Sequence, residues 1–309
     1  MNNDAIKIIE NINKVIVGKE ETVNFAVMTF LAGGHLLLED VPGVGKTTLA
    51  NAIAASSGCD FSRIQFTPDT LPSDVTGTSI YDMKNSTFQF IKGAVMSNIV
   101  LADEINRTSP KTQASLLEAM EEKQVTADGK TYKLEEPFMV IATQNPSDFL
   151  GTYNLPEAQL DRFLMRISIG YPEFDDEKQM AENFLKGITR HTLTPVVSKE
   201  DILRMQKKTA AVKVVPDVSS YIVSIVSATR ENEKLRLGAS PRATLAMIRA
   251  SQASAYISGR DYVTPDDVQR VVYNVLCHRL TLSSQAKMEK TDVHSVIERI
   301  IGKIGVPVM

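Results

Sequence analysis

The sequence has little of what marks disulfide-rich, membrane-spanning or metal-binding proteins. It contains two cysteines, Cys59 and Cys277, and no CxxC pair, so neither a disulfide framework nor a thiolate zinc site is expected. Its four histidines are scattered along the chain. No stretch of about 18 apolar residues occurs, so we expect no spanning helix and no membrane insertion. The N-terminus lacks a basic region followed by an apolar segment, which argues against a signal peptide. We therefore expect a cytoplasmic protein with a metal-free core.

The composition is that of an ordinary globular chain. Of 309 residues, 43% are hydrophobic and 23% charged, which excludes wholesale disorder. The net charge of −3 gives no general attraction to nucleic acid. This charge is unevenly divided: residues 1–171 carry 14 basic and 21 acidic side chains, whereas residues 172–309 carry 20 and 16. An acidic front half and a basic back half predict two domains, 1–171 and 172–309.

The front half alternates short apolar runs with helical segments. Strands are predicted at residues 35–39, 61–65, 98–103, 138–143 and 163–169, and helices at 47–57 and 110–122. Strands separated by helices are typical of an α/β fold with a parallel sheet flanked by helices. Asp128-Gly129, between strand-forming residues, predicts a hairpin inserted at about 124–137. The back half contains helix starts only, so we expect an all-α domain there.

A strand, a glycine-rich turn and a helix follow one another after residue 35, as a phosphate-binding loop requires. The turn and first helical residues read Pro42, Gly43, Val44, Gly45, Lys46, Thr47 and Thr48. Glycines allow backbone amides to approach phosphate oxygens, and the helix N-terminus favours an anion. Lys46 would reach the β- and γ-phosphates, and the Thr47 hydroxyl would bind Mg²⁺.

One position departs from the G-x-x-x-x-G-K-[ST] pattern, because Asp40 stands where the first glycine would be. We expect residue 40 only to help the chain leave the strand. The alternative for the whole segment is a chance glycine-rich loop.

Polar residues end two further strands. Asp103 and Glu104 follow a buried strand, and Asn145 follows the next. Carboxyl ends of parallel strands share one edge, so these side chains should face the same crevice as Lys46. Asp103 would hold Mg²⁺, Glu104 would activate the attacking water, and Asn145 would bond the γ-phosphate or orient the water. The alternatives are a solvated loop at 103–104 and an Asn-Pro turn.

Together these segments resemble Walker A, Walker B and sensor 1 of AAA+ ATPases, and more narrowly the MoxR family of the helix-2-insert clade. The likeness covers nearly the full length. It is carried by RIQFTPDTLPSDVTG at 63–77, LADEINR at 101–107, PKTQ at 110–113, LLEAM at 116–120 and LPEAQLDRF at 155–163.

The resemblance implies a P-loop AAA+ core with a C-terminal helical lid. It places a helix-2 insertion at about 77–97 and a second inserted hairpin at 124–137, both projecting toward the pore or substrate side. Val17 and Gly18 match the segment beside the adenine. The purely structural alternative is a turn between two helices at Gly18.

The resemblance also implies roles for four arginines. Arg162 matches the arginine finger that reaches a neighbouring subunit's nucleotide, with Arg166 as a second candidate. Arg242 matches sensor 2, which would contact the γ-phosphate of its own subunit. Arg107 would lie near the subunit interface. Alternatives are a surface pair of Arg162 with Asp161 or Glu157, and a solvated Arg242.

The implied activity is Mg²⁺-dependent hydrolysis of ATP to ADP and phosphate between subunits of a ring, expected to be a hexamer. The implied output is chaperone-like remodelling or maturation of an unidentified protein or metalloenzyme client, with a von Willebrand factor type A domain protein as partner. Rival interpretations are a nucleic-acid motor, a binding module with little hydrolysis, and a magnesium-chelatase-like metal-insertion ATPase. The acidic front half makes nucleic acid an unfavoured partner.

Overall fold

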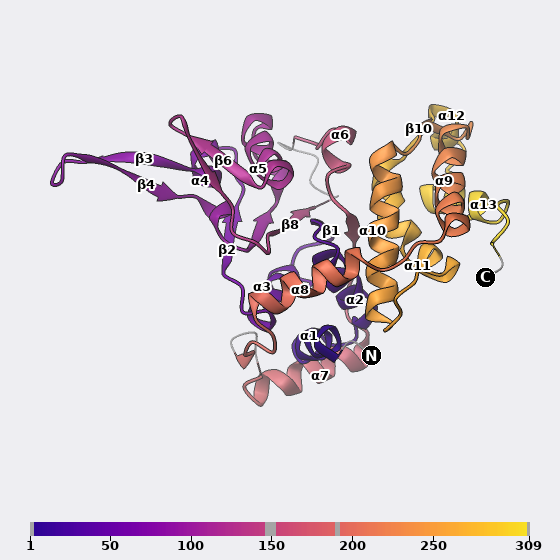
Figure 1. The fold of residues 1–309 in the computed structure, drawn as a ribbon, viewed down its shortest axis with the longest axis horizontal. Helices are drawn as coiled ribbons and strands as arrows, with labels where there is room; N and C mark the ends of the chain where they lie inside the picture. The colour runs from indigo at the N-terminus through magenta and orange to yellow at the C-terminus, as the bar shows by residue number, and fades with distance from the viewer. Residues whose placement is uncertain (1–2, 146–152, 189–191, 308–309) are drawn as a thin grey trace.

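The computed structural model describes residues 3–145, 153–188 and 192–307. A five-stranded parallel sheet lies at the centre of the N-terminal part (Figure 1). Its strands, in spatial order, are β2 (Phe61–Gln65), β5 (Ile99–Asp103), β8 (Met139–Gln144), β1 (Leu36–Glu39) and β9 (Met165–Ile167). Every neighbouring pair is parallel. The predicted parallel sheet is confirmed, with all five predicted segments forming strands.

Helices cover both faces of this sheet, because its strands alternate side chains between two apolar clusters. Leu36 and Leu38 of β1 join the cluster on one face, and Leu37 joins the other. The first face packs against α1 (Asn3–Asn13), α2 (Glu20–Leu31) and α3 (Lys46–Ser56), and the second against α4 (Pro72–Thr76) and α5 (Pro110–Glu122). Helix α5 begins as predicted, with Ser109 as N-cap and proline in its first turn.

Two antiparallel hairpins extend from the core. They consist of β3 (Gly77–Asp82) with β4 (Thr87–Lys92), and β6 (Gln124–Ala127) with β7 (Lys130–Lys133). Asp128 and Gly129 both have positive φ, as the predicted hairpin turn requires. Phe90 stacks on Tyr132 at 4.0 Å between ring centroids, and the Ser79 amide donates to Asp128. The hairpins therefore contact each other, while β3–β4 projects far from the sheet (Figure 1).

The C-terminal part is a helical lid. Its helices are α7 (Phe174–Leu185), α8 (Lys199–Ala210), α9 (Pro216–Arg230), α10 (Pro241–Ile257), α11 (Pro265–Leu276), α12 (Ser284–Met288) and α13 (Val293–Ile301). The expectation of helices only was wrong in one detail: β10 (Leu235–Leu237) pairs with β11 (Thr281–Leu282). Strands of three and two residues are too short to leave a period-two pattern in the sequence.

One apolar cluster runs through both parts, since buried residues of α8 to α11 pack with those of α1 to α3. The lid is therefore anchored to one face of the core, and the boundary at 171/172 stays a prediction. Across the described residues, no helix combines the length and apolar character needed to cross a membrane.

Candidate active site

The loop between β1 and α3 has the backbone that a phosphate site requires. Gly43 has φ of 86° and Gly45 φ of 98°, in the left-handed region that favours glycine. Gly45 is the N-cap of α3 and offers no side chain to the amides of the first turn. These amides need a partner from elsewhere, and an anion is well suited to them.

Lys46 lies at the start of α3 and is held inside the loop. Its Nζ donates to the Asp40 carbonyl oxygen at 2.7 Å. Burial lowers the pKa of Lys46, and the negative charges of Asp40, Asp103 and Glu104 oppose that shift. The predicted lysine and the two predicted carboxylates are thus brought to one edge of the sheet.

Asp40 does more than the expected strand exit, which corrects that interpretation. Its Oδ2 accepts hydrogen bonds from the Ser168 hydroxyl at 3.0 Å, the Ile169 amide at 2.5 Å and the Gly170 amide at 2.8 Å. Its Oδ1 accepts the Val41 amide at 3.0 Å. The carboxylate is buried and fully engaged. Residue 40 therefore ties the phosphate loop to the chain that leaves β9 toward the lid.

Asp103 ends the buried strand β5 with both carboxylate oxygens bonded. Oδ1 accepts from the Thr143 hydroxyl at 2.7 Å, and Oδ2 accepts from Arg63 Nη2 at 2.7 Å and Nε at 3.2 Å. Thr143 and Arg63 come from the two strands beside β5, so the sheet itself fixes the carboxylate. Sequence reasoning missed both partners, because only strand order brings them together.

Glu104 adopts a left-handed backbone conformation, with φ of 56° and ψ of 51°. Such a conformation is uncommon for a residue other than glycine and clusters at functional sites. The Glu104 amide donates to the Thr143 hydroxyl at 2.8 Å. Its side-chain Oε2 accepts from Gln65 and from Arg107, each at 3.0 Å. The carboxylate is thus held at the sheet edge by two donors, neither of which was predicted as its partner.

Asn145 follows β8, the strand between β1 and β5. Asn145 is buried, and the carbonyl oxygen of its neighbour Gln144 accepts a hydrogen bond from the Asp40 amide at 3.2 Å. Asn145 therefore leaves the sheet beside the phosphate loop, as expected for its predicted position. The Pro146 part of the predicted Asn-Pro turn lies outside the described residues.

The predicted adenine-side segment connects α1 to α2 and lies against the phosphate loop. A Cβ on Gly45 would come within 3.9 Å of the Ile16 side chain. Gly18 has φ of 69°, and a Cβ there would lie 1.9 Å from Asp176 Oδ2, so the first turn of α7 sits directly on it. Val17, next to Gly18, is half-buried. The adenine role of this segment stays a prediction.

These residues fit ATP and Mg²⁺. The part of the chain that the structure describes has no group of three His, Cys, Asp or Glu side chains able to bind a metal alone. Mg²⁺ in proteins is usually held by one or two carboxylates together with substrate phosphates and water. Thr47, Asp103 and an anion on the α3 amides would supply such a ligand set.

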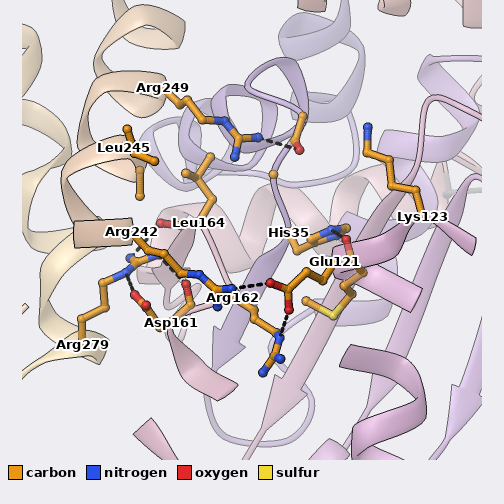
Figure 2. A pocket seen from close by; sticks show the side chains of 14 residues that line it. His35, Glu121, Lys123, Asp161, Arg162, Leu164, Arg242, Leu245, Arg249 and Arg279 are labelled. Atoms are coloured by element: carbon orange, nitrogen blue, oxygen red, sulfur yellow. Dashed lines mark hydrogen bonds and ion pairs between the residues drawn. The ribbon is translucent and has the colours of Figure 1, made fainter. Parts of the chain in front are cut away.

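Arg162 and Arg242 lie together at the other end of β1. Arg162 Nε bonds Glu121 Oε2 at 2.9 Å, and Arg242 bonds the other oxygen of the same carboxylate (Figure 2). These arginine hydrogen bonds lower the pKa of Glu121. The three side chains line a cavity of about 330 Å³ that also includes Gly33 and His35, which precede β1.

This placement corrects the expected position of Arg242 over the phosphate loop of its own chain. Helix α10 begins at Pro241, and the Ser240 hydroxyl just before it donates to Asp161 at 2.7 Å. Farther along α10, Arg249 donates to the Ala32 carbonyl oxygen at 2.6 Å. The helix that carries Arg242 is thus fixed to the end of the core where β1 begins, which we call the arginine end because Arg162 and Arg242 meet there. Within the described residues, the Arg162 side chain bonds Glu121 and the Ala158 carbonyl oxygen rather than either alternative partner, Asp161 or Glu157.

Arg166 lies on β9 and bonds Glu39 Oε2 at 2.7 Å, at the phosphate-loop end of the sheet. Arg162 precedes β9 and Arg166 is its middle residue, and their side chains reach opposite ends of β1, at Glu121 and Glu39. Helix α5 connects the two ends: Gln113 near its start donates to the Ile105 carbonyl oxygen at 3.1 Å, directly after Glu104, and Glu121 lies at its end.

The fold and site define a AAA ATPase. Residues 35–165 match the family described as "ATPase family associated with various cellular activities (AAA)", and residues 227–300 match the AAA lid domain. The first range contains four strands of the sheet, the first residue of β9, the phosphate loop and the carboxylates, and the second contains α10 and α11.

The relatives narrow this class. The chain is 50% identical over 302 residues to the uncharacterised protein YeaC of Bacillus subtilis, covering 98% of this chain and 94% of that protein. It is 41% identical over 305 residues to Chaperone MoxR1 of Mycobacterium tuberculosis, covering 96% and 80%. A crystal structure from Cytophaga hutchinsonii, of a protein proposed to be an ATPase, matches with a TM-score of 0.93 and 40% identity over 99% of this chain and 96% of that one. The chain belongs to the MoxR family of AAA+ ATPases.

Proposed function

We propose that this chain hydrolyses ATP with Mg²⁺ at sites shared between neighbouring subunits of a ring, expected to be a hexamer. The observation that carries the proposal is the separation of two groups within one chain. Lys46, Asp103 and Glu104 lie where the strands end, whereas Arg162 and Arg242 lie where β1 begins. Rings built from head-to-tail contacts bring opposite faces of adjacent copies together.

The phosphate loop would bind the triphosphate through the glycine-rich backbone and the first amides of α3. Lys46 would exchange the Asp40 carbonyl oxygen for β- and γ-phosphate oxygens. Thr47 and Asp103 would hold Mg²⁺, which when bound offsets phosphate charge during phosphoryl transfer. Val17 and Gly18 would lie beside the adenine.

Glu104 would orient the attacking water and accept its proton, because its carboxylate stands at the sheet edge beside Asp103. Gln65 and Arg107 hold this carboxylate in the free chain. Asn145 would donate to the γ-phosphate or orient the water.

Arg162 and Arg242 would both contact the nucleotide bound by the neighbouring subunit. Guanidinium groups on the transferring phosphoryl group stabilise the charge of the transition state. A contact of Arg242 with its own chain's γ-phosphate does not fit its pairing with Glu121, so we assign it to the neighbour beside Arg162.

The output we propose is chaperone-like remodelling or maturation of a protein client, in keeping with the name of the relative Chaperone MoxR1. The projecting β3–β4 hairpin exposes Ile80, Met83 and Phe88, apolar side chains that a protein client could contact. A von Willebrand factor type A domain partner and a cytoplasmic location stay predictions.

The test uses two inactive variants. Lys46→Ala should abolish ATP binding, and Arg162→Ala should lower turnover about 10³-fold. Mixed rings of the two should recover activity, because about one quarter of randomly formed interfaces join an intact loop to an intact arginine. Phosphate release measures the recovery.

The matched controls are Lys207→Ala and Arg299→Ala, which change exposed lid residues. Each should keep near-normal turnover. Two affinity tags purified in sequence ensure that the assayed rings contain both chains. Mixed rings that stay as inactive as either parent would refute a site shared between subunits.

A further inference from the structure

Arg279 is a buried cation that joins the lid to the segment carrying Arg162. It ends η4 (Cys277–Arg279), directly after α11, and its side chain is 2% exposed. Its Nε donates to Asp161 Oδ1 at 2.8 Å, and Nη2 donates to the carbonyl oxygens of Asp161 at 3.2 Å and Phe163 at 2.5 Å. Nη1 donates to the Leu164 carbonyl oxygen at 3.2 Å. One guanidinium thus holds both flanks of residue 162.

Other lid residues hold the same segment. The Ser240 hydroxyl donates to Asp161 Oδ2 at 2.7 Å, so both oxygens of this carboxylate are bound by the lid. Arg236 of β10 donates to Glu157 at 2.6 Å, at the start of α6 (Glu157–Leu160). The segment from Glu157 to Leu164 is therefore anchored from the lid along its length.

The core contacts the same segment, since the Leu164 amide donates to the His35 carbonyl oxygen at 2.8 Å and Phe163 is buried in the apolar cluster of the second sheet face. Strand β9, which follows this segment, is at the edge of the sheet and pairs only with β1. A buried arginine costs several kcal/mol of desolvation unless it is paired, so Arg279 is stable only with its acceptors in place. The position of residues 161–164 and that of the lid are consequently set together.

We propose that Arg279 is a positioning residue for Arg162. The lid of each chain, through Arg279 and Asp161, sets the arginine that this chain offers to its neighbour's nucleotide. This inference rests on the proposed function, since Arg162 needs a neighbouring site to act upon. The lid would thus position a residue at the end of the core opposite the phosphate loop of the same chain.

The experiment asks on which chain the substitution matters. Mixed rings contain a donor chain, Lys46→Ala, which supplies Arg162 but no ATP site, and an acceptor chain, Arg162→Ala, which supplies the ATP site but no arginine. Arg279→Gln is introduced into one chain or the other. The loss of phosphate release should be at least about tenfold larger on the donor chain, because a small misplacement of a catalytic group costs up to about 10²-fold.

A structural role alone would not produce this asymmetry. The KM for ATP of the mixed rings should stay unchanged, since ATP is bound by the acceptor chain, while kcat falls. Arg260→Gln is the matched control, because Arg260 forms an ion pair with Asp267 inside the lid. It should give equal effects on both chains.

Ser240→Ala keeps the test valid if Arg279→Gln fails to fold. It removes a single hydrogen bond to Asp161 and should give the same donor-chain preference with a smaller loss. Equal losses on the two chains, or none on the donor chain, would overturn the positioning role alone. A parent pair that recovers no activity would instead contradict the proposed function and this inference with it.

Discussion

The two ends of the central sheet carry different charged groups. Where the strands end, Lys46 lies among the carboxylates of Asp40, Asp103 and Glu104. Arginines are present there too, but Arg63, Arg107 and Arg166 pair with Asp103, Glu104 and Glu39. Where β1 begins, Arg162 and Arg242 share the single carboxylate of Glu121.

The comparison shows that the two ends carry complementary groups. One end has a phosphate loop and carboxylates suited to metal and water, and the other has guanidinium groups suited to a phosphoryl group. Four residues of β1, about 13 Å of extended chain, separate them. Under the proposed function, one chain would contribute each half of the shared site to a different neighbour.

The largest expected effect comes from removing the proposed proton acceptor at the phosphate-loop end. Glu104→Gln should lower phosphate release by about 10² to 10⁴-fold, because the amide cannot accept the water's proton, and should retain ATP binding. Glu118→Gln, an exposed change on α5, is the control.

The same variant should still serve as an arginine donor, since its Arg162 is intact. Mixed with Arg162→Ala, it should restore turnover as Lys46→Ala does. Near-normal turnover of the Glu104→Gln ring by itself would exclude Glu104 as the base.

A smaller effect is expected from restoring the motif glycine at position 40. Asp40→Gly removes a buried carboxylate and leaves the Ile169 and Gly170 amides without their acceptor, which should cost about 3 kcal/mol of unfolding free energy. Urea denaturation measures it. Asp69→Gly in an exposed loop should change stability by less than about 0.5 kcal/mol. If Asp40→Gly were equally neutral, residue 40 would serve only as a strand exit.

The smallest effect tests the arginine end through pH. Burial lowers the pKa of His35 to about 4, and its ring bonds the Val140 amide and the Met120 carbonyl oxygen. Between about pH 6.5 and 4 the unfolded chain binds a proton at His35 that the folded chain does not, so stability falls as pH falls. From pH 7.5 to 5 the loss from His35 should be about 2 kcal/mol.

His35→Gln removes the titration while retaining one acceptor and one donor. Urea denaturation at both pH values should show a smaller pH-dependent loss in this variant than in the parent. His278 is also buried with a lowered pKa and is unchanged in this variant. It should therefore account for part of the pH dependence of stability that remains. Identical slopes in the two proteins would contradict the assignment to His35.

The sheet and the phosphate-loop end were predictable because their signals are local. The strands Ile99–Asp103 and Met139–Gln144 are nearly continuous apolar runs, typical of strands buried on both faces. The glycine-rich turn follows β1 within a few residues, and a motif of consecutive residues can be read without knowing the fold. Strand ends in a parallel sheet then bring Asp103 and Lys46 to one edge.

The arginine end was not predictable in the same way. The position of Arg242 depends on how α10 packs on the core, and this packing joins residues more than 100 positions apart, such as Arg242 and Glu121. Arg279 sits in no motif, and its partners Asp161 to Leu164 become visible only in three dimensions. The bonds of Asp40 to Ser168 and Gly170 are equally remote in sequence.

The length and position of helix α5 mechanically connect the two ends of the sheet. Its 13 residues form a rod of about 20 Å that starts beside Glu104 and ends at the carboxylate shared by Arg162 and Arg242. A tilt of about 5° around its first turn would carry Glu121 through about 1 Å, enough to weaken a hydrogen bond. In such a tilt the helix would work as a lever, with Glu104 near its pivot and the paired arginines at its far end.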